Sequence, residues 1–426
     1  MQSENEVIIV GGGLAGLTAA VTLARAGRRV KLFERAASVG GRALTSQHGA
    51  FAFNLGPHAL YAEGAATRIL KELNIQWHSQ RPALGGYALV EGRRETFPAG
   101  AASLMTTGLF TVAEKWEAGQ WLAKLGKLEV SDLQDISLQD WLAEKVSHLR
   151  LRQFLQALVR ISTYANDAQR QSAGAALAQL QMGLAAGVRY LDGGWQTLVD
   201  GLQAAASAAG VNIQTSQPVQ SVVVEQGQTR GVTVADGSLH AARQVVLAAS
   251  PAVALSLTSD FAPTAWQQQL NGLLPVKAAC LDVALKQLPQ PQARFALGID
   301  QPLYFSVHSA TARLAPSKGA LIHVAKYLAT DEQTPAPAIE TELEQILDLL
   351  QPGWRDVLVK RRFMPALTVN HALVTAAQGG LRGRPAIHLP DTTGLFIAGD
   401  WVGDEGQLAD ASVASAAATA RAILNT

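Results

Sequence analysis

The 426-residue sequence predicts an α/β fold: a mostly parallel sheet with a small antiparallel insert, a helical insertion, and a second region of mixed α+β structure. Three observations predict this class. A β-branched strand, a glycine-rich turn and a helix follow one another at residues 6–26. Helical periodicity dominates residues 98–187, and short apolar strands return before a small-residue helix at residues 408–424.

Composition excludes several classes of protein. Hydrophobic residues make up 48% of the chain and charged residues 16%, which is too apolar for a disordered polypeptide. The net charge is +1 and the basic pairs are short and scattered, so no nucleic-acid partner is expected. Cys280 is the only cysteine, which excludes an intrachain disulfide and a cysteine zinc site, and we predict no metal.

The N-terminal residues and the hydropathy of the chain predict where in the cell the protein is located. Residues 1–6 are polar and acidic, without the basic and apolar regions of a signal peptide. No window offers the roughly 18 uninterrupted apolar residues of a membrane span. We therefore expect a cytoplasmic protein. Residues 97–110 are apolar enough to rest on lipid, so peripheral contact with the inner face of a membrane stays open as the lesser alternative to a buried helix.

The first elements form a βαβ unit. Residues 6–10 are a β-branched run typical of a buried strand, residues 14–26 are small and apolar as in a close-packed helix, and residues 29–34 read as the second strand. Gly27 suits the C-terminal cap of the helix. A strand–turn–helix–strand order of this length predicts a parallel pair of strands with the helix crossing between them.

Later segments extend this sheet and interrupt it. Residues 244–249 and 394–400 are short apolar strands, and residues 219–239 predict a small antiparallel layer with a hairpin turn at Asp236–Gly237. Residues 278–285, 321–328 and 339–350 predict two strands and a long helix of a second region. The expected division is a nucleotide-binding part from residues 1–97, 191–250 and 390–426, a helical insertion at 98–190, and a substrate region at 251–389.

The glycine-rich turn carries the first chemical signal. Gly11, Gly13 and Gly16 match the G-x-G-x-x-G pattern, with Leu14 and Ala15 opening the helix whose N-terminus faces the phosphates. The first glycine makes the turn, the second lets a pyrophosphate approach, and the third brings helix and strand together. Glu34 ends the second strand and is placed to bind ribose hydroxyls, with Arg35 beside it. At this point NAD and FAD both remain open.

The next segment favours FAD. Gly40, Gly41 and Arg42 follow the ribose acid at once and offer a second flat backbone and a cation to the pyrophosphate. A nicotinamide site does not normally use such a contact. The alternative is an ordinary glycine turn beside an exposed arginine.

Several segments together resemble one known family. They lie in order over most of the chain: residues 10–17, 33–42, 54–58, 191–195, 219–225 and 395–400. They resemble the superfamily of flavin-dependent amine oxidases, phytoene desaturases and protoporphyrinogen oxidases. The resemblance implies a Rossmann-like FAD-binding domain and an FAD-dependent oxidoreductase, but it does not specify a substrate.

The resemblance also implies roles for individual residues. Gly399 and Asp400 would bind the ribityl and phosphate region, and Leu408 and Ala409 would lie near the pyrimidine edge of the flavin. Val219 would meet the adenine, while Gly56 and Pro57 would approach the isoalloxazine. No cysteine lies in the C-terminal flavin region, so the cysteinyl link of some amine oxidases is not expected and the FAD should be noncovalent.

Three further residues concern catalysis. His58 is a candidate proton donor, although a structural role is favoured for it. Lys277 lies roughly where amine oxidases carry a lysine that holds a water near flavin N5, although a lysine at the solvent end of a strand is the favoured alternative. Gln407 is a candidate cofactor-binding residue at the position of the cage tyrosine of amine oxidases, so the aromatic cage looks broken. Trp195, Tyr304, Phe305, Tyr327 and Trp401 are candidate pocket walls.

The resulting hypothesis is a desaturase-like or oxidase-like enzyme that removes hydride from a C–H bond of a hydrophobic small molecule to flavin N5. Its expected partners are that substrate and an electron acceptor, either dioxygen or a quinone-like molecule. Two alternatives stay open: a flavin amine or amino-acid oxidase, and a non-oxidising flavin-dependent isomerase. Oligomeric state is not predicted.

Overall fold

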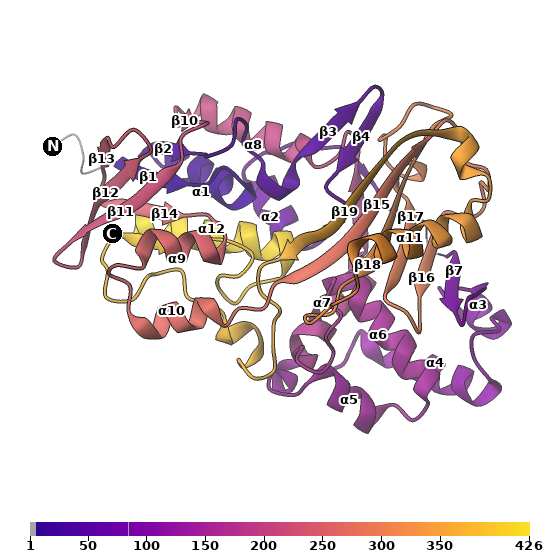
Figure 1. The fold of residues 1–426 in the computed structure, drawn as a ribbon. Helices are drawn as coiled ribbons and strands as arrows, with labels where there is room; N and C mark the ends of the chain where they lie inside the picture. Colours follow the sequence, from indigo (N-terminus) through magenta and orange to yellow (C-terminus); the bar gives the residue numbers. More distant parts are fainter. Residues whose placement is uncertain (1–5, 84) are drawn as a thin grey trace.

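The computed structural model describes residues 6–83 and 85–426, so the polar start at residues 1–5 lies outside the described residues. The chain forms two regions that lie side by side (Figure 1). One holds a parallel sheet with helices against it, and the other holds a large, mainly antiparallel sheet. Within the described residues, no helix is both long enough and apolar enough to cross a bilayer.

A five-stranded parallel sheet forms the first region, in the order β10-β2-β1-β14-β20. Its strands are β1 (Glu6–Val10), β2 (Arg29–Phe33), β10 (Asn212–Gln214), β14 (Gln244–Leu247) and β20 (Leu395–Ile397). The expected βαβ unit is therefore present, and the strands at 244–249 and 394–400 join the same sheet. Strands far apart in sequence thus bring their carboxyl ends to one edge, where ligands of such sheets bind.

Both faces of this sheet are covered because its central strand, β1, is apolar on both sides from Val7 to Val10. Val7 and Ile9 pack in a core with four helices: α1 (Leu14–Arg25), α2 (Ala65–Glu72), α8 (Gln196–Ala208) and α12 (Leu408–Leu424). Ile8 and Val10 point the other way, toward α9 (Pro251–Thr258), α10 (Thr264–Asn271) and a small antiparallel sheet. That small sheet consists of β11 (Val219–Glu225), β12 (Gln228–Val234) and β13 (Leu239–Ala241), with the expected turn at Asp236–Gly237.

The second region is built on a seven-stranded sheet in the order β19-β15-β18-β17-β16-β7-β8. Its strands are β7 (Tyr87–Val90), β8 (Arg93–Thr96), β15 (Val276–Leu285), β16 (Phe295–Gly298), β17 (Leu303–Val307), β18 (Ala320–Tyr327) and β19 (Leu358–Asn370). The expected division puts residues 1–97 wholly in the nucleotide-binding part, whereas β7 and β8 lie in this sheet. The physical reason is a parallel pairing of β7 with β16, a contact between distant residues that local pattern does not reveal.

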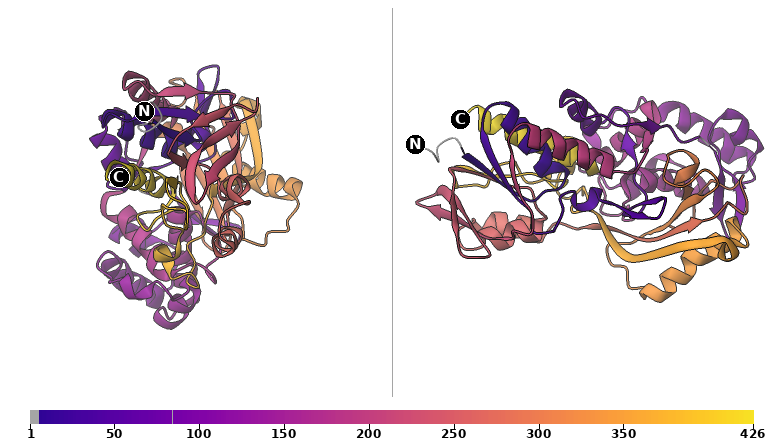
Figure 2. Two further views of the ribbon diagram at one scale, coloured as in Figure 1. Left: turned by 90° about the vertical axis from the view of Figure 1, so that its left-hand side faces the viewer. Right: turned by 90° about the horizontal axis from the view of Figure 1, so that it is seen from above.

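Helices cover this sheet on opposite faces (Figures 1 and 2). α11 (Ala336–Leu350) packs on one face with Leu281 and Val283 of β15. The helical insertion packs on the other, against Ala278 and Cys280. It comprises α3 (Ala101–Thr106), α4 (Val112–Leu125), α5 (Leu138–Lys145), α6 (Leu149–Thr163) and α7 (Ala173–Ala186).

Short elements join the two regions. The pair β3 (Thr45–His48) and β4 (Phe51–Asn54) is antiparallel, and β9 (Val188–Leu191) pairs with both β5 (Leu60–Tyr61) and β6 (Ser79–Gln80). A 3-10 turn at Gly41–Ala43 precedes β3. These connections carry residues 40–61 from the glycine turn after β1 to β15, where Gly56 packs against Cys280.

Candidate flavin site

The glycine turn after β1 has the geometry that its sequence predicts. Gly11 has a φ of 105°, and a Cβ there would lie 2.4 Å from the carbonyl oxygen of Ala248. A Cβ on Gly16 would lie 1.9 Å from the carbonyl oxygen of Gly11, so only glycine lets α1 approach β1 this closely. A Cβ on Gly13 would meet nothing within 4 Å. The turn is therefore tight on the protein side and open at Gly13.

Glu34 and the second glycine pair hold this turn in place. One carboxylate oxygen of Glu34 accepts a hydrogen bond from Gly12 N–H at 2.7 Å, and the other accepts one from Ala36 N–H at 2.8 Å. Gly40 N–H donates to the Gly12 carbonyl at 2.7 Å. The two glycine segments thus lie against each other, and both face the same open space.

Asp400 is the centre of a buried charge cluster at the carboxyl end of β20. Its carboxylate receives Arg42 Nη1 at 2.7 Å, His371 N–H at 3.0 Å and His371 Nδ1 at 2.9 Å. Burial alone would raise the pKa of Asp400, but the positive charge of Arg42 and the bonds from His371 hold that pKa well below its usual range. Asp400 is therefore ionised at neutral pH, and it anchors Arg42.

A single cavity of about 840 Å³ connects these groups. It extends from the Gly11 turn to Asp400, to α12 and to Ala278 and Cys280 of β15. Its volume lies within the usual range for ligand sites. Most of the residues that sequence reasoning assigned to the cofactor line it: Gly11, Gly13, Leu14, Ala15, Glu34, Arg35, Gly40, Gly41, Arg42, Pro57, His58, Val219, Gly399, Asp400, Leu408 and Ala409.

Three of the assigned cofactor residues do not line the cavity. Gly16 lies under the turn against Gly11, where its predicted role was packing. Gly56 packs against Cys280, whose Sγ would be 2.9 Å from a Cβ at that position. Gln407 is buried and donates through Nε2 to the carbonyl of Ala175 on α7 at 2.9 Å. Their direct contacts with the cofactor stay predictions without support from this geometry.

His58 is held by the backbone. Nδ1 lies 3.1 Å from the Gly56 carbonyl and Nε2 lies 3.2 Å from the Arg42 carbonyl, while the ring packs edge-on against Trp195. Burial lowers the pKa of His58 to about 4, although the two carbonyl oxygens act in the other direction. The imidazole is therefore neutral at pH 7, and its place among the cavity residues leaves a proton-donor role as a prediction.

Lys277 lies on β15, beside the cavity but directed away from it. Ala278 and Cys280 of the same strand line the cavity, and side chains alternate along a strand, so Lys277 is on the other face and is exposed. Of the aromatic candidates for the wall, Trp195 lines the cavity. The other four, Tyr304, Phe305, Tyr327 and Trp401, are buried in hydrophobic cores.

The structure adds residues that sequence reasoning did not select. Tyr164, which ends α6 with a φ of 61°, lines the cavity and donates its hydroxyl hydrogen to the Pro57 carbonyl at 2.8 Å. His371 and Arg384 support Asp400, the latter by donating to its carbonyl at 3.1 Å. Asp410, in the first turn of α12, also lines the cavity. None of these belongs to a short motif, so no local signal identifies them.

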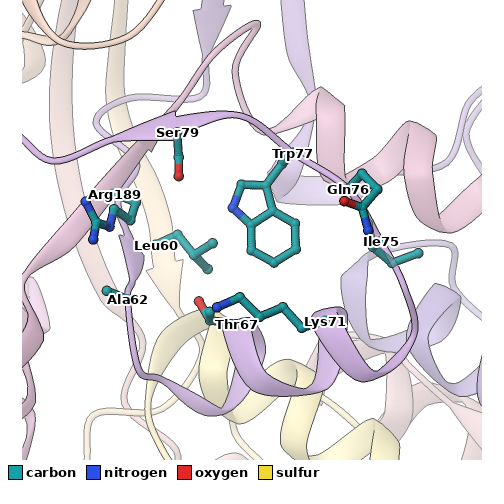
Figure 3. Close-up of a pocket in the computed structure, with 9 residues that line it drawn as sticks. All are labelled: Leu60, Ala62, Thr67, Lys71, Ile75, Gln76, Trp77, Ser79 and Arg189. Atoms are coloured by element: carbon teal, nitrogen blue, oxygen red, sulfur yellow. The ribbon is translucent and has the colours of Figure 1, made fainter.

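A smaller cavity of about 420 Å³ lies between α2 and the β5–β9–β6 sheet (Figure 3). Leu60 contributes to the walls of both cavities. In Figure 3 the Lys71 side chain runs along α2 below the indole of Trp77, and Arg189 lies on the opposite strand. None of its lining residues is acidic. This cavity is separate from the site that the glycine motifs predict.

The large cavity fits an FAD. The N-termini of α1 and α12 both border it, and each supplies unpaired backbone N–H groups and a positive dipole end for an anionic cofactor. The open space at Gly13 suits a pyrophosphate, and Glu34 lies at the end where a ribose would sit. Cys280 lines the wall, but burial raises the pKa of its thiol well above the usual value, which disfavours a covalent link to the cofactor.

Comparison with known proteins agrees with this geometry. Residues 14–424 match the family of flavin-containing amine oxidoreductases. A 4,4'-diaponeurosporene oxygenase of Staphylococcus aureus is 24% identical over 274 residues, which cover 56% of this chain and 54% of that protein. The chain thus spans about half the length of the curated relatives it matches.

Solved structures share the fold over nearly the whole chain. An oxidoreductase from Methanosarcina mazei is 20% identical with a TM-score of 0.79, covering 98% of this chain and 100% of the other. Cyclohexylamine oxidase from Brevibacterium oxydans is 16% identical with a TM-score of 0.71, covering 98% and 99%. At this identity the likeness establishes the fold and not the substrate.

Proposed function

Because this chain belongs to the flavin-containing amine oxidoreductase family, we propose that it removes hydride from a carbon–hydrogen bond of a hydrophobic small molecule to N5 of a noncovalent FAD. The protein is an FAD-dependent oxidoreductase. Bound FAD supplies the acceptor for two electrons and one hydrogen nucleus. The proposal concerns the substrate class, the desaturase-like reaction and the residues that shape the site.

One observation carries the choice of substrate class. The part of the wall contributed by β15, β19 and the residues that follow β19 and α6 has no acidic side chain, and the His371 ring is engaged by Asp400. Its members are Tyr164, Ala278, Cys280, Leu367, Thr368, Val369 and His371. Against this part of the wall a substrate ammonium would lose its hydration without an adjacent acid, because the acids that line the cavity, Glu34, Asp400 and Asp410, lie on other elements.

The same wall weakens the alternative of amine oxidation. Lys277 is exposed on the other face of β15, and Gln407 is bonded to α7, so neither is placed to act on an amine beside a flavin. The curated relative acts, by its name, on diaponeurosporene. For this chain we propose a hydrophobic substrate that loses hydrogen, which is a different reaction from the oxygenation that the relative's name states.

In this proposal the protein binds, orients and excludes water. Arg42, fixed by Asp400, and the two helix N-termini bind the anionic cofactor. Tyr164 is fixed by its bond to the Pro57 carbonyl, and its ring forms part of the apolar wall. Burial raises the pKa of the Tyr164 hydroxyl well above its usual value, so the phenol stays neutral and is no base at neutral pH. Hydride removal would leave a substrate cation, which would form its double bond by releasing one proton to solvent, so we assign no protein residue as the base.

Anaerobic photometry tests the proposal. The purified protein should be yellow, and a linear isoprenoid hydrocarbon in detergent should bleach the flavin stoichiometrically while putrescine does not. Leu367→Asn should weaken the apparent affinity for the hydrocarbon by about tenfold or more, because a polar group faces the chain, and Leu367→Met is the matched control. Bleaching by putrescine alone would refute the substrate class. Conversion of the hydrocarbon without bleaching would favour the isomerase.

We also propose peripheral contact with a lipid surface through α3 and α4. Met105 is 69% exposed, Val112 86% and Trp116 75%, and these side chains lie on neighbouring helices of the insertion. Lys115 lies on the same helix, next to Trp116. An apolar patch with an aromatic side chain and a cation suits a membrane interface, where a hydrophobic substrate and a quinone-like acceptor reside. The cytoplasmic location is part of this proposal.

Flotation with anionic liposomes tests the contact. The double substitution Val112→Ser with Trp116→Gln should reduce the bound fraction severalfold, since it removes the most exposed apolar side chains. Leu349→Ser on α11 is the control because it is also exposed but lies on the other face of the large sheet. Equal flotation of all three proteins would exclude this surface.

A further inference from the structure

Asp410 has a buried carboxyl group, and one of its two oxygens has no hydrogen-bond partner among the described residues. It is the third residue of α12, only 2% of it is exposed, and it lines the large cavity. Oδ1 accepts a hydrogen bond from Ala66 N–H of α2 at 2.8 Å. Oδ2 is buried and has no hydrogen-bond partner among the described residues. A buried polar atom without a partner costs free energy, so it calls for a functional reason.

A structural role explains only part of this arrangement. α2 begins after Gly64, which offers no side-chain cap, and Asp410 caps that helix from α12. Gly64 leaves room for it, because a Cβ there would lie 2.3 Å from Oδ2. Figure 3 shows the start of α2 lying beside the yellow ribbon of α12. The cap uses Oδ1 alone and leaves Oδ2 buried beside Gly64 without a bond.

The surroundings make the carboxyl easy to protonate. Burial raises the pKa of Asp410 to about 6, although the bond from Ala66 lowers it, and nearby Glu405 raises it further. Glu405 is itself paired with Arg68 of α2 at 2.8 Å. On β5, Tyr61 faces it with a phenol whose own pKa is raised by burial, and that hydroxyl donates to the Ser162 carbonyl. No cation pairs with Asp410 in the described residues.

We propose that Asp410 takes up one proton from solvent when the flavin of this site is reduced. Hydride from the substrate would bring two electrons and one hydrogen nucleus to the bound flavin and give it one additional negative charge, while the cation left on the substrate would release one proton to solvent as its double bond forms. A proton from water converts the Asp410 carboxylate to the acid, so the net charge of the cavity is unchanged. The inference rests on the proposed function, because it requires a flavin that cycles between redox states here.

Potentiometry across pH gives the test. Between pH 7 and 9 the midpoint potential of the wild-type holoenzyme should fall more steeply than one proton per two electrons. Asp410→Asn keeps an acceptor for Ala66 N–H but cannot titrate, so its slope should be one proton per two electrons. Glu405→Gln is the matched control, since its side chain is half exposed, and it should keep the wild-type slope.

An infrared measurement makes the test independent of how the variant folds. In the reduced-minus-oxidised spectrum of the wild-type holoenzyme at pH 8, the C=O stretch of a protonated carboxylic acid should appear and shift in D2O. Equal slopes for wild type and Asp410→Asn, or a wild-type spectrum without that band, would overturn the inference while FAD binding and turnover stand. A protein that retains no FAD would instead remove the proposed function.

Discussion

The buried carboxyl of Asp410 should make stability depend on pH in a direction opposite to that of an ordinary paired acid. Its folded-state pKa is about 6 against 3.8 for the exposed group, a rise of about 2.2 units. At 1.36 kcal/mol per unit this is about 3 kcal/mol of free energy of unfolding. Because the folded pKa is raised, that contribution is complete below pH 3.8 and is lost as pH rises through 6.

The pH range compared in the experiment, from 5 to 8, covers only part of the titration of Asp410. Between pH 5 and pH 8 a group with these two pKa values loses about 1.4 kcal/mol of its contribution. Asp410→Asn cannot ionise, so it should lack that loss whatever its own stability is. The quantity to compare is the change in the free energy of unfolding between the two pH values, wild type minus variant, since other titrating groups cancel in that difference.

Urea denaturation followed by tryptophan fluorescence at pH 5 and pH 8 measures this quantity. The wild type should lose about 1.4 kcal/mol more than Asp410→Asn on going to pH 8. Glu405→Gln should keep most of the wild-type difference, because burial is the main cause of the raised pKa of Asp410 and Glu405 adds a smaller contribution. A double difference near zero, or one of opposite sign, would refute the assignment of a buried, unpaired carboxyl.

Three further outcomes follow from the site. Glu34→Ala should weaken FAD retention by tenfold or more in equilibrium dialysis and lower the melting temperature only slightly; unchanged affinity would contradict the ribose assignment. Gly16→Ala should abolish FAD binding, because its Cβ would lie 1.9 Å from the Gly11 carbonyl, whereas Gly119→Ala has nothing nearer than 3.9 Å and should be tolerated. Lys277→Met should leave flavin reoxidation by dioxygen, measured by stopped flow, within about twofold, since the side chain is exposed; a large loss would restore the amine-oxidase alternative.

The agreement between sequence and structure is best where the signal is local. The βαβ unit, the glycine turn and the helix Leu408–Leu424 depend on periodicity and on what a glycine permits within a few residues. The resemblance to a flavin family rested on such segments, and it is confirmed by the match over residues 14–424. The same reasoning placed most of the proposed cofactor residues around one cavity, although their contacts with FAD remain proposals.

Disagreement begins where the outcome depends on packing between distant segments. β7 joins the large sheet because it pairs with β16, about 210 residues along the chain. Lys277 faces away from the cavity because successive side chains of β15 point to opposite faces of the sheet, and the adjacent Ala278 faces the cavity. Gln407 reaches α7 instead of the cavity. Sequence position alone could not decide any of these orientations.

By itself, the sequence determined the element order, the nucleotide-binding turn and the flavin family, because glycine conformations and hydrophobic periods act over neighbouring residues. Only the tertiary structure decided that Arg42 would neutralise Asp400 across 358 positions, that the part of the cavity wall from β15 and β19 would lack an acid, and that Asp410 would lie buried between two helix N-termini. The charge state of a group depends on what surrounds it, and those surroundings exist only once the chain has folded.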